Sequence, residues 1–424
     1  MKSLLKQIWP ILCIAALLMA PACIDDSLRD GSDRNSQTDD DKDNDIDNPG
    51  VVRVVTDPEA ALAAANCIMV KPGQKVSIPI AKAFAVWDQY KDLLGKADMT
   101  KDMAPMLVWS YPDEMVDWDG LEIEDYDDVN KAVITFKVTP GMKGNALVAL
   151  TVDGTIRWSW HIWVTDYEPG QDIRPETLAT GPNDVTNGKV YRYVNGAGDL
   201  VWMDRNLGAN EADKTKGKET FGMYYQWGKK DPMPGFAPQN YYPDRPGEAP
   251  PEYDRNNLAY SIQHPDEFIV QNGQGDWYSY VSGTYDPDLW GSFSRKKTIW
   301  DPCPEGWKVP LYGLPRITRL SGITAPDYLK APWHILEAEN KFIRNEQYPG
   351  YESPVLGYWP AAGVVIGEPW YEELQFYWSG SDEMGNLSNG SAVFREGMYS
   401  FSWERRYGMS MRCVRISKEN NDEK

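Results

Sequence analysis

The chain has few of the side chains that bind metals or attack substrates, with 5 Cys and 3 His among 424 residues. A metal site needs about four ligands at close spacing, whereas His161, His264 and His334 lie far apart in the sequence. A cysteine nucleophile needs a base and an oxyanion donor, and no motif for either is present. We therefore expect no catalytic residue, no metal, no cofactor and no enzyme activity.

Positive charge is also scarce, since 43 Lys and Arg face 63 Asp and Glu, which gives a net charge of -20. Such a chain repels phosphate backbones, which excludes nucleic acid as a partner. Phe is the rarest aromatic residue, with 10 against 18 Trp and 24 Tyr. Trp and Tyr suit β-sheet faces and contacts with sugars or proteins. The 35 Gly and 31 Pro predict many turns and few long helices.

Long apolar runs are lacking, apart from residues 8–22 near the N-terminus. This run of about 15 residues is shorter than the roughly 20 that a membrane-spanning helix needs. Lys2 and Lys6 precede it. Residues 1–22 are therefore expected to be a secretory signal peptide rather than a membrane anchor.

The sequence Ala-Pro-Ala-Cys at residues 20–23 resembles the processing box of bacterial lipoproteins. The resemblance implies that Cys23 is acylated, for example with palmitate, and becomes the new N-terminus. Acyl chains would then hold the protein on the outer membrane. Ala20 departs from the leucine that is usual there, and a plain signal peptide with an incidental cysteine stays open as the alternative.

Residues 23–50 are strongly acidic and almost without apolar side chains, with ten Asp against Arg29, Arg34 and Lys42. Such a segment buries too little surface to offset its ordering entropy, so we expect a disordered tether. Acidic residues directly after the lipid-bearing cysteine also resemble the surface-export signal of gut-type Gram-negative lipoproteins. That resemblance implies a protein on the outer membrane that faces the cell exterior.

Residues 51–168 are expected to be all-β, because strand patterns flank Asp153-Gly154, a strong hairpin signal. In the second of these strands the Trp-bearing face is predicted to lie in a core, and a platform for sugar rings is the alternative. Residues 66–80, 144–154 and 158–166 resemble a domain of fimbrillin-type surface lipoproteins. The resemblance implies an immunoglobulin-like β-sandwich.

Residues 169–188 are rich in Pro, Gly and Thr and form the predicted linker. Residues 189–417 are expected to form a loop-rich α+β domain, followed by a polar tail at 418–424. Five segments resemble, in order, the FISUMP (major paralogous) domain, which is similar to C-type-lectin-like folds. They are LVWMDRNLGA, YYQWG, CPEGWKVP, YWSGS and RCVRI. Calcium-ligand and oxygenase-cysteine motifs of related folds are missing, so neither chemistry is carried over.

Cys303 lies between two prolines, where it is a candidate nucleophile, metal ligand or half of a disulfide. The surroundings favour the disulfide, because Asp301 and Glu305 would oppose thiolate formation. Cys413 is the one other cysteine after residue 188, and the two can pair in an oxidising compartment. Such a bond closes a loop of about 110 residues and contributes roughly 4 to 5 kcal/mol to stability by the chain-entropy model. Cys67 is expected to be a buried thiol.

Two function hypotheses follow. One is an adhesive or structural cell-surface lipoprotein, such as a fimbrial accessory or tip subunit in cell adhesion, with pilus subunits or a host protein or glycan as partners. The other is a glycan-binding surface lipoprotein of a polysaccharide-uptake system. In the second, five aromatic residues would stack on sugar rings unless they pack in the core. They are Trp277, Tyr278, Tyr280, Trp370 and Tyr371.

The lipoprotein hypothesis predicts that Cys23→Ala releases the protein from the membrane fraction, because the variant has no acylation site. Fractionation of cells into membrane and soluble material, followed by immunoblotting, measures this. A variant protein that stays in the membrane fraction would show that the anchor lies elsewhere.

Overall fold

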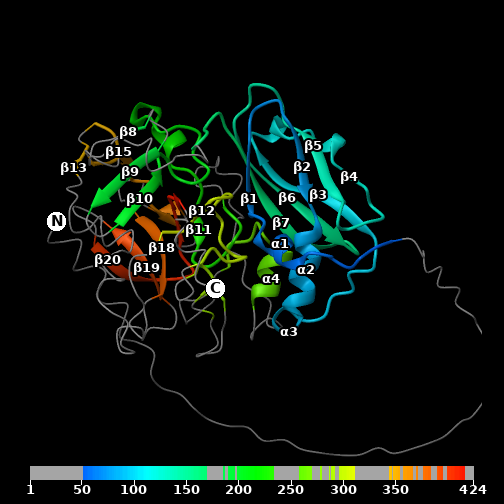
Figure 1. Ribbon diagram of the computed structural model, residues 1–424. Coiled ribbons are helices and arrows are strands. Elements are labelled where there is room, and N and C mark those ends of the chain that lie inside the picture. The colour runs from blue at the N-terminus through cyan, green and yellow to red at the C-terminus, as the bar shows by residue number, and fades with distance from the viewer. Residues whose placement is uncertain are drawn as a thin grey trace, which may run out of the picture. The chain divides into compact units, whose positions relative to one another are not determined.

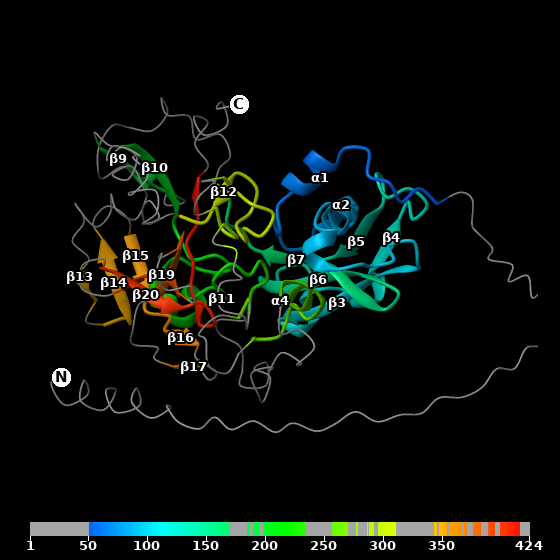
Figure 2. The same cartoon turned by 90° about the horizontal axis from the view of Figure 1, so that it is seen from below.

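The computed structural model describes residues 51–169, 198–233, 257–269, 296–310 and 399–415 without a break, together with shorter stretches between 185 and 394. The expected signal peptide, tether and tail, and most of the expected linker, lie outside the described residues. Gly50–Lys424 form one compact unit. Within it, the strands before residue 170 lie on one side and the C-terminal strands on the other (Figures 1 and 2). No described helix is both long and apolar enough to cross a membrane.

Two sheets form the first part of this unit. Their strand orders are β1-β7-β6-β3 and β2-β5-β4. The predicted hairpin is confirmed, because Val152 of β6 pairs with Thr155 of β7 and both turn residues, Asp153 and Gly154, have positive φ. The strands are β1 (Cys67–Val70), β2 (Lys75–Pro79), β3 (Met103–Tyr111), β4 (Glu122–Glu124), β5 (Val133–Lys137), β6 (Gly144–Val152) and β7 (Thr155–Val164).

The all-β expectation for residues 51–168 was wrong, because this region also contains short helices. Helix α2 buries six successive residues, 82–87, so its sequence shows no amphipathic period that would have revealed it. The Asp57 side chain caps α1, accepting a hydrogen bond from the Ala60 N–H at 3.0 Å. The helices are α1 (Pro58–Ala63), α2 (Ala81–Gln89) and α3 (Lys91–Leu94), with 3-10 turns η2 (Asp113–Met115) and η3 (Trp118–Gly120).

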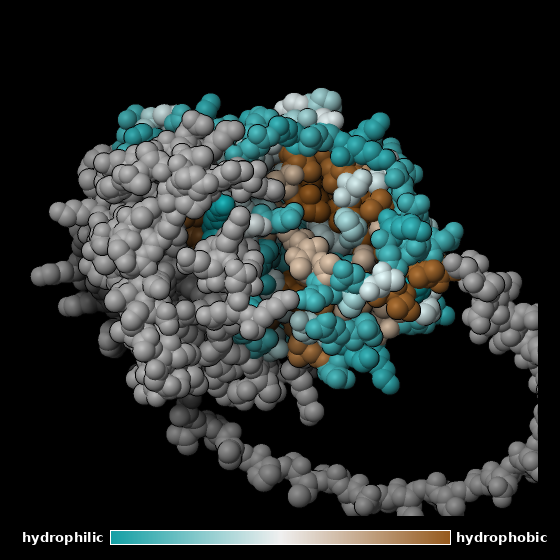
Figure 3. All heavy atoms as spheres, in the orientation of Figure 1, coloured by the Kyte–Doolittle hydropathy of each residue, from teal (hydrophilic) through white to brown (hydrophobic). Residues whose placement is uncertain are grey.

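Polar side chains cover much of the visible surface of this region, with hydrophobic patches between them (Figure 3). The large hydrophobic residues that stay exposed, among those described, are Val52, Val54, Met106 and Trp118. The Trp118 side chain is the largest of these and is 67% exposed.

Among the described residues, the C-terminal part consists mainly of short strands, where a loop-rich α+β domain was expected. Its sheets have the orders β12-β22-β10-β9-β8, β11-β21-β16-β17, β13-β14-β15 and β18-β19-β20. Strands β9 and β10 are antiparallel neighbours, and Gly198 of β10 pairs with Asn195 of β9. The 3-10 segment η5 (Lys214–Thr220) and the helix α4 (Asn257–Gln263) accompany the strands.

The bounds of the C-terminal strands are as follows: β8 (Val185–Thr186), β9 (Val190–Asn195), β10 (Gly198–Met203), β11 (Tyr225–Gln226), β12 (Trp307–Lys308), β13 (Ile343–Arg344), β14 (Gly350–Ser353), β15 (Gly357–Pro360), β16 (Val364–Val365), β17 (Pro369–Trp370), β18 (Phe376–Asp382), β19 (Asn389–Phe394), β20 (Tyr399–Glu404), β21 (Gly408–Met409) and β22 (Val414–Arg415). Residues 331–345 have the clearest helical periodicity in the sequence, but most of them lie outside the described residues, and Ile343–Arg344 form the strand β13.

Cys303 and Cys413 form a disulfide, with the two sulfur atoms 2.01 Å apart. The loop that carries Cys303 is organised by the buried carboxylate of Asp301. This carboxylate accepts hydrogen bonds from the backbone N–H groups of Cys303 at 2.8 Å and Val309 at 2.9 Å. It also pairs with the Lys297 ammonium at 2.7 Å. The negative charge beside Cys303 is therefore used to fold the loop.

The strands before residue 170 and the C-terminal part share one hydrophobic core. Cys67 of β1 forms a parallel bridge with Pro304, next to the disulfide. The rings of Trp158 on β7 and Trp300 lie 5.5 Å apart. The edge of the four-stranded sheet is thus covered by the Cys303 loop, which removes a site for unwanted strand pairing.

The side chain of Asn66 forms hydrogen bonds across this junction. Its side-chain amide, almost fully buried, donates hydrogen bonds to the backbone oxygens of Ile299 at 2.7 Å and Asp301 at 3.0 Å. Its Oδ1 accepts a hydrogen bond from the Trp158 indole at 3.3 Å. One side chain therefore satisfies three buried groups, two of which come from the C-terminal part.

We expect Asn66→Ala to lower the free energy of unfolding by about 2 to 4 kcal/mol, because buried polar groups lose their partners. Urea denaturation of the full chain measures this. Ser77→Ala, at an exposed position of β2, serves as the control and should change stability by less than about 0.5 kcal/mol. An Asn66→Ala protein as stable as this control would show that the junction does not depend on the amide.

Candidate functional site

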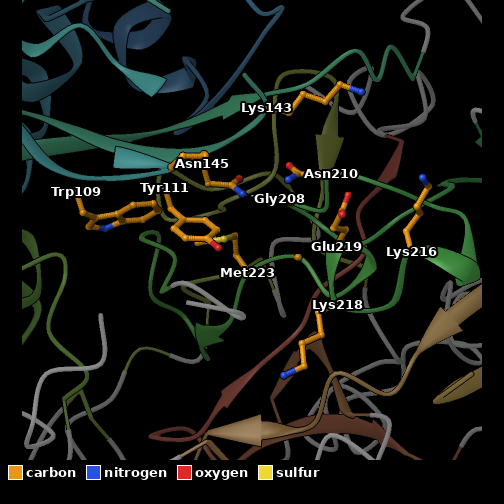
Figure 4. Close-up of a pocket in the computed structure, with 12 residues that line it drawn as sticks. Trp109, Tyr111, Lys143, Asn145, Gly208, Asn210, Lys216, Lys218, Glu219 and Met223 are labelled. Carbon is orange, nitrogen blue, oxygen red and sulfur yellow. Dashed lines mark hydrogen bonds between the residues drawn. The ribbon is translucent and has the colours of Figure 1, made fainter. Parts of the chain in front are cut away.

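A cleft of about 500 Å³ lies where the N-terminal sheets meet residues 208–223. Figure 4 shows aromatic side chains and Met223 on one side of it and most of the polar side chains on the other. Its volume is in the range typical of small-molecule sites. The lining residues are Trp109, Tyr111, Pro112, Lys143, Asn145, Gly208, Asn210, Lys216, Lys218, Glu219, Gly222 and Met223.

The aromatic side of the cleft comes from the end of β3. Trp109 and Tyr111 are two residues apart on this strand and therefore project from the same face. Tyr111 lies opposite Asn145 in the ladder between β3 and β6. The Trp109 side chain is only 7% exposed, and its indole N–H is buried without a hydrogen-bond partner. Because this N–H is closed to solvent, Trp109 offers the cleft the apolar surface of its ring and not a hydrogen-bond donor.

Asn145 holds the two parts of the chain together at the floor of the cleft. Its Nδ2 donates a hydrogen bond to the backbone oxygen of Gly208 at 2.8 Å. Gly208 has φ of 82°, and a Cβ atom there would come within 3.0 Å of Asn145 Oδ1. Glycine is therefore required both by the backbone conformation and by this close approach.

His161, behind Asn145, fixes the orientation of that amide. Its Nε2 lies 2.9 Å from Asn145 Oδ1, and its Nδ1 lies 3.4 Å from the Tyr225 hydroxyl. Because Oδ1 can only accept, Nε2 carries the proton of the neutral ring and Nδ1 accepts from Tyr225. Burial lowers the pKa of His161 to about 3, so the ring stays neutral at ordinary pH.

The polar side of the cleft contains amide and charged groups. Asn210 contributes a side-chain oxygen that is buried without a partner. Lys143 pairs with Asp166 at 2.7 Å and with Glu211 at 3.8 Å. The remaining charged residues of the lining lie on η5 and are exposed: Lys216, Lys218 and Glu219. The cleft thus combines an aromatic wall with exposed charged groups, two lysines and one glutamate.

A second group of reactive side chains lies at the junction, where Ser159, Lys230 and Asp231 are in contact. Lys230 Nζ donates to Ser159 Oγ at 2.6 Å, and Ser159 Oγ donates to Asp231 at 2.7 Å. The ammonium also pairs with Asp231 at 2.6 Å. Ser159 is fully buried and both charged residues nearly so, so no substrate can reach the hydroxyl. The group links β7 to the C-terminal part.

Cys67, the one described cysteine outside the disulfide, is not placed for nucleophilic chemistry. Cys67 is a free, buried thiol, and burial raises its pKa far above the ordinary value. A thiol in this state is inert. Within the described ranges, no group of three or more His, Cys, Asp or Glu residues is placed to hold a metal ion.

The aromatic residues proposed from the sequence as sugar contacts do not form this site. Trp277 and Tyr278 are 0% and 6% exposed, and Trp277 donates its indole N–H to the backbone oxygen of Trp227 at 2.7 Å. That assignment was wrong for these two residues, because they pack in the core. Tyr280, Tyr371 and the side chain of Trp370 lie outside the described residues, as does Cys23.

The segments that resemble the FISUMP domain converge inside the C-terminal part. Asn206 donates to the Tyr377 hydroxyl at 3.1 Å, and Arg412 donates to Asn206 at 3.4 Å. The Trp378 indole donates to the backbone oxygen of Tyr225 at 2.7 Å. These five residues are all buried. Their contacts therefore build the core and do not face the cleft.

No protein-family model, no curated protein and no solved structure matches this chain.

The pKa of His161 predicts a stability loss in acid. Between pH 6.5 and about 3 the unfolded chain takes up a proton that the folded chain does not. The contribution is complete above pH 6.5, and stability falls by about 1 kcal/mol for each pH unit below it. His161→Gln keeps an amide donor and should flatten this slope, as measured by urea denaturation across the pH range.

The matched control is His264→Gln, at an exposed surface position. It should leave the pH dependence of the wild-type protein unchanged. If the His161→Gln and His264→Gln proteins show the same slope, His161 does not govern acid stability.

Proposed function

We propose that this chain is an adhesive, lipid-anchored protein of the cell surface whose cleft binds carbohydrate. The observation that carries the proposal is the aromatic wall of Trp109 and Tyr111 across the cleft from the exposed polar side chains of η5. Sugar hydroxyls both donate and accept hydrogen bonds, so they can bind the Lys216 ammonium and the Glu219 carboxylate on the polar side. The C–H faces of a pyranose ring stack on aromatic rings.

The proposal treats the protein as a binding module and not as an enzyme. The cleft contains a single carboxylate, Glu219, among its lining residues, whereas glycoside hydrolysis uses a pair that flanks the scissile bond. The Ser159 cluster is closed to substrate. Binding needs only the complementary surface that the cleft provides.

The proposed architecture is an immunoglobulin-like sandwich that carries a C-type-lectin-like domain of the FISUMP type. The two facing sheets before residue 170 support the first part. The ordered segments that converge around Asn206 and Arg412, together with the Cys303–Cys413 disulfide, support the second. A rigid head of this kind at the end of a lipid-anchored tether suits a fimbrial accessory or tip subunit.

A glycan-binding lipoprotein of a polysaccharide-uptake system is the second candidate, because the same cleft serves it equally well. The two candidates differ in assembly. Pull-down from filaments sheared off the cell surface should recover the chain if it belongs to a fimbria. Co-purification with an outer-membrane transporter would favour the uptake system.

Carbohydrate binding is tested with the mature, full-length chain in detergent on a glycan array. We expect Tyr111→Ala, which removes the more exposed ring of the aromatic wall, to weaken binding of the retained glycan about threefold to tenfold, the loss of one stacking contact. Trp118→Phe, at the exposed tryptophan of η3, is the control and should bind as the wild type does.

An array on which no glycan is retained would overturn the proposal. So would a retained glycan whose affinity is the same for Tyr111→Ala and for Trp118→Phe, because binding would then take place away from the cleft.

A further inference from the structure

The charged residues of the cleft differ in sign from the protein as a whole. The chain has a net charge of -20, yet three lysines and one glutamate line the cleft. Asp166 and Glu211 neutralise Lys143, so the positive charge at the cleft is that of Lys216 and Lys218, which can attract an anionic group to this point of an acidic protein. The binding partner should therefore carry negative charge.

The lysines are not equivalent. Lys143 is held by Asp166 and Glu211 and fixes the wall of the cleft. Lys216 and Lys218 lie on η5 with exposed side chains. Figure 4 shows the Lys216 side chain on the same side as Asn210 and Glu219, across from the aromatic rings. A ring that stacks on Tyr111 would therefore direct its opposite edge toward this polar side.

The hydrogen-bonding groups of the lining residues also favour an anionic ligand. The lysines are donors only, whereas the Glu219 carboxylate accepts. A neutral sugar offers hydroxyls that balance donors and acceptors. A carboxylate adds acceptors alone, and charge-assisted hydrogen bonds to ammonium groups are the stronger kind.

We infer that the cleft takes an acidic sugar, a pyranose that carries a carboxylate, with the ring against Trp109 and Tyr111 and the carboxylate toward Lys216. This inference rests on the proposed carbohydrate binding and adds the class of ligand. Hexuronic acids and sialic acids share this chemistry and differ in ring substituents. Glu219 would accept a hydrogen bond from a ring hydroxyl, since it would repel the carboxylate.

The test compares a tri-galacturonate with its fully methyl-esterified form, which keeps the rings and removes the charge. Binding to the mature, full-length chain is measured by calorimetry. We expect the acid to bind at least tenfold more tightly than the ester, and added salt to weaken binding of the acid alone. Sialyllactose is compared with lactose in the same way. This second comparison shows whether a sialic acid, and not only a hexuronic acid, supplies the carboxylate.

Lys216→Gln should weaken binding of the preferred acid about threefold to tenfold and leave binding of the neutral ester unchanged. Lys137→Gln, at an exposed position of β5, is the control for a loss of charge elsewhere and should change neither. Both variants lie at the surface, so both proteins should fold.

The possible failures are distinguishable. If the ester binds as tightly as the acid, the acidic-sugar inference is overturned while the carbohydrate function stands. If polyglutamate competes as well as tri-galacturonate, or if Lys216→Gln behaves as Lys137→Gln does, recognition depends on general charge and the inference is overturned. If neither acidic nor neutral glycans bind, the proposed function itself fails.

Discussion

Burial of strand β7 on both faces is the constraint on which the rest of the structure depends. The aliphatic side chains of the strand need no hydrogen-bond partners. Ser159 and His161, in contrast, are polar and almost completely buried. Each unpaired polar group would cost on the order of 1 to 3 kcal/mol. The C-terminal part supplies the partners, Lys230 with Asp231 for the serine and Tyr225 for the histidine. The two parts are therefore bound to each other by polar groups as well as by a shared core.

The cleft is a product of the same constraint. His161 is neutral because it is buried, and the neutral ring orients the Asn145 amide, which in turn donates to Gly208. The backbone near Gly208 is thereby held against the end of β3, where Trp109 and Tyr111 project. A ligand site built on strands and fixed by buried hydrogen bonds is rigid before the ligand arrives, which lowers the entropic cost of binding.

The sequence predicts the local elements of this protein better than its site. The Asp153-Gly154 hairpin follows from turn chemistry that acts over two residues, and it is present as expected. The cleft joins the end of β3 to residues 208–223, and no local pattern reports such a contact. The one sequence feature that marks the cleft is the spacing of Trp109 and Tyr111, which lie two residues apart in one strand. Trp277 was misassigned because composition cannot distinguish an aromatic residue in a core from one at a surface.

The segments that resemble a known domain contribute few residues to the cleft. This separation has a physical reason. Asn206, Tyr377 and Arg412 are buried in mutual contact, so any change there disturbs packing. Lys216 and Lys218 lie on an exposed 3-10 segment beside the cleft, where a substitution alters charge and leaves the core intact. A substitution on η5 would therefore change the proposed ligand specificity without disturbing the core. A resemblance carried by the buried segments describes the scaffold, and the choice of ligand has to be read from the cleft itself.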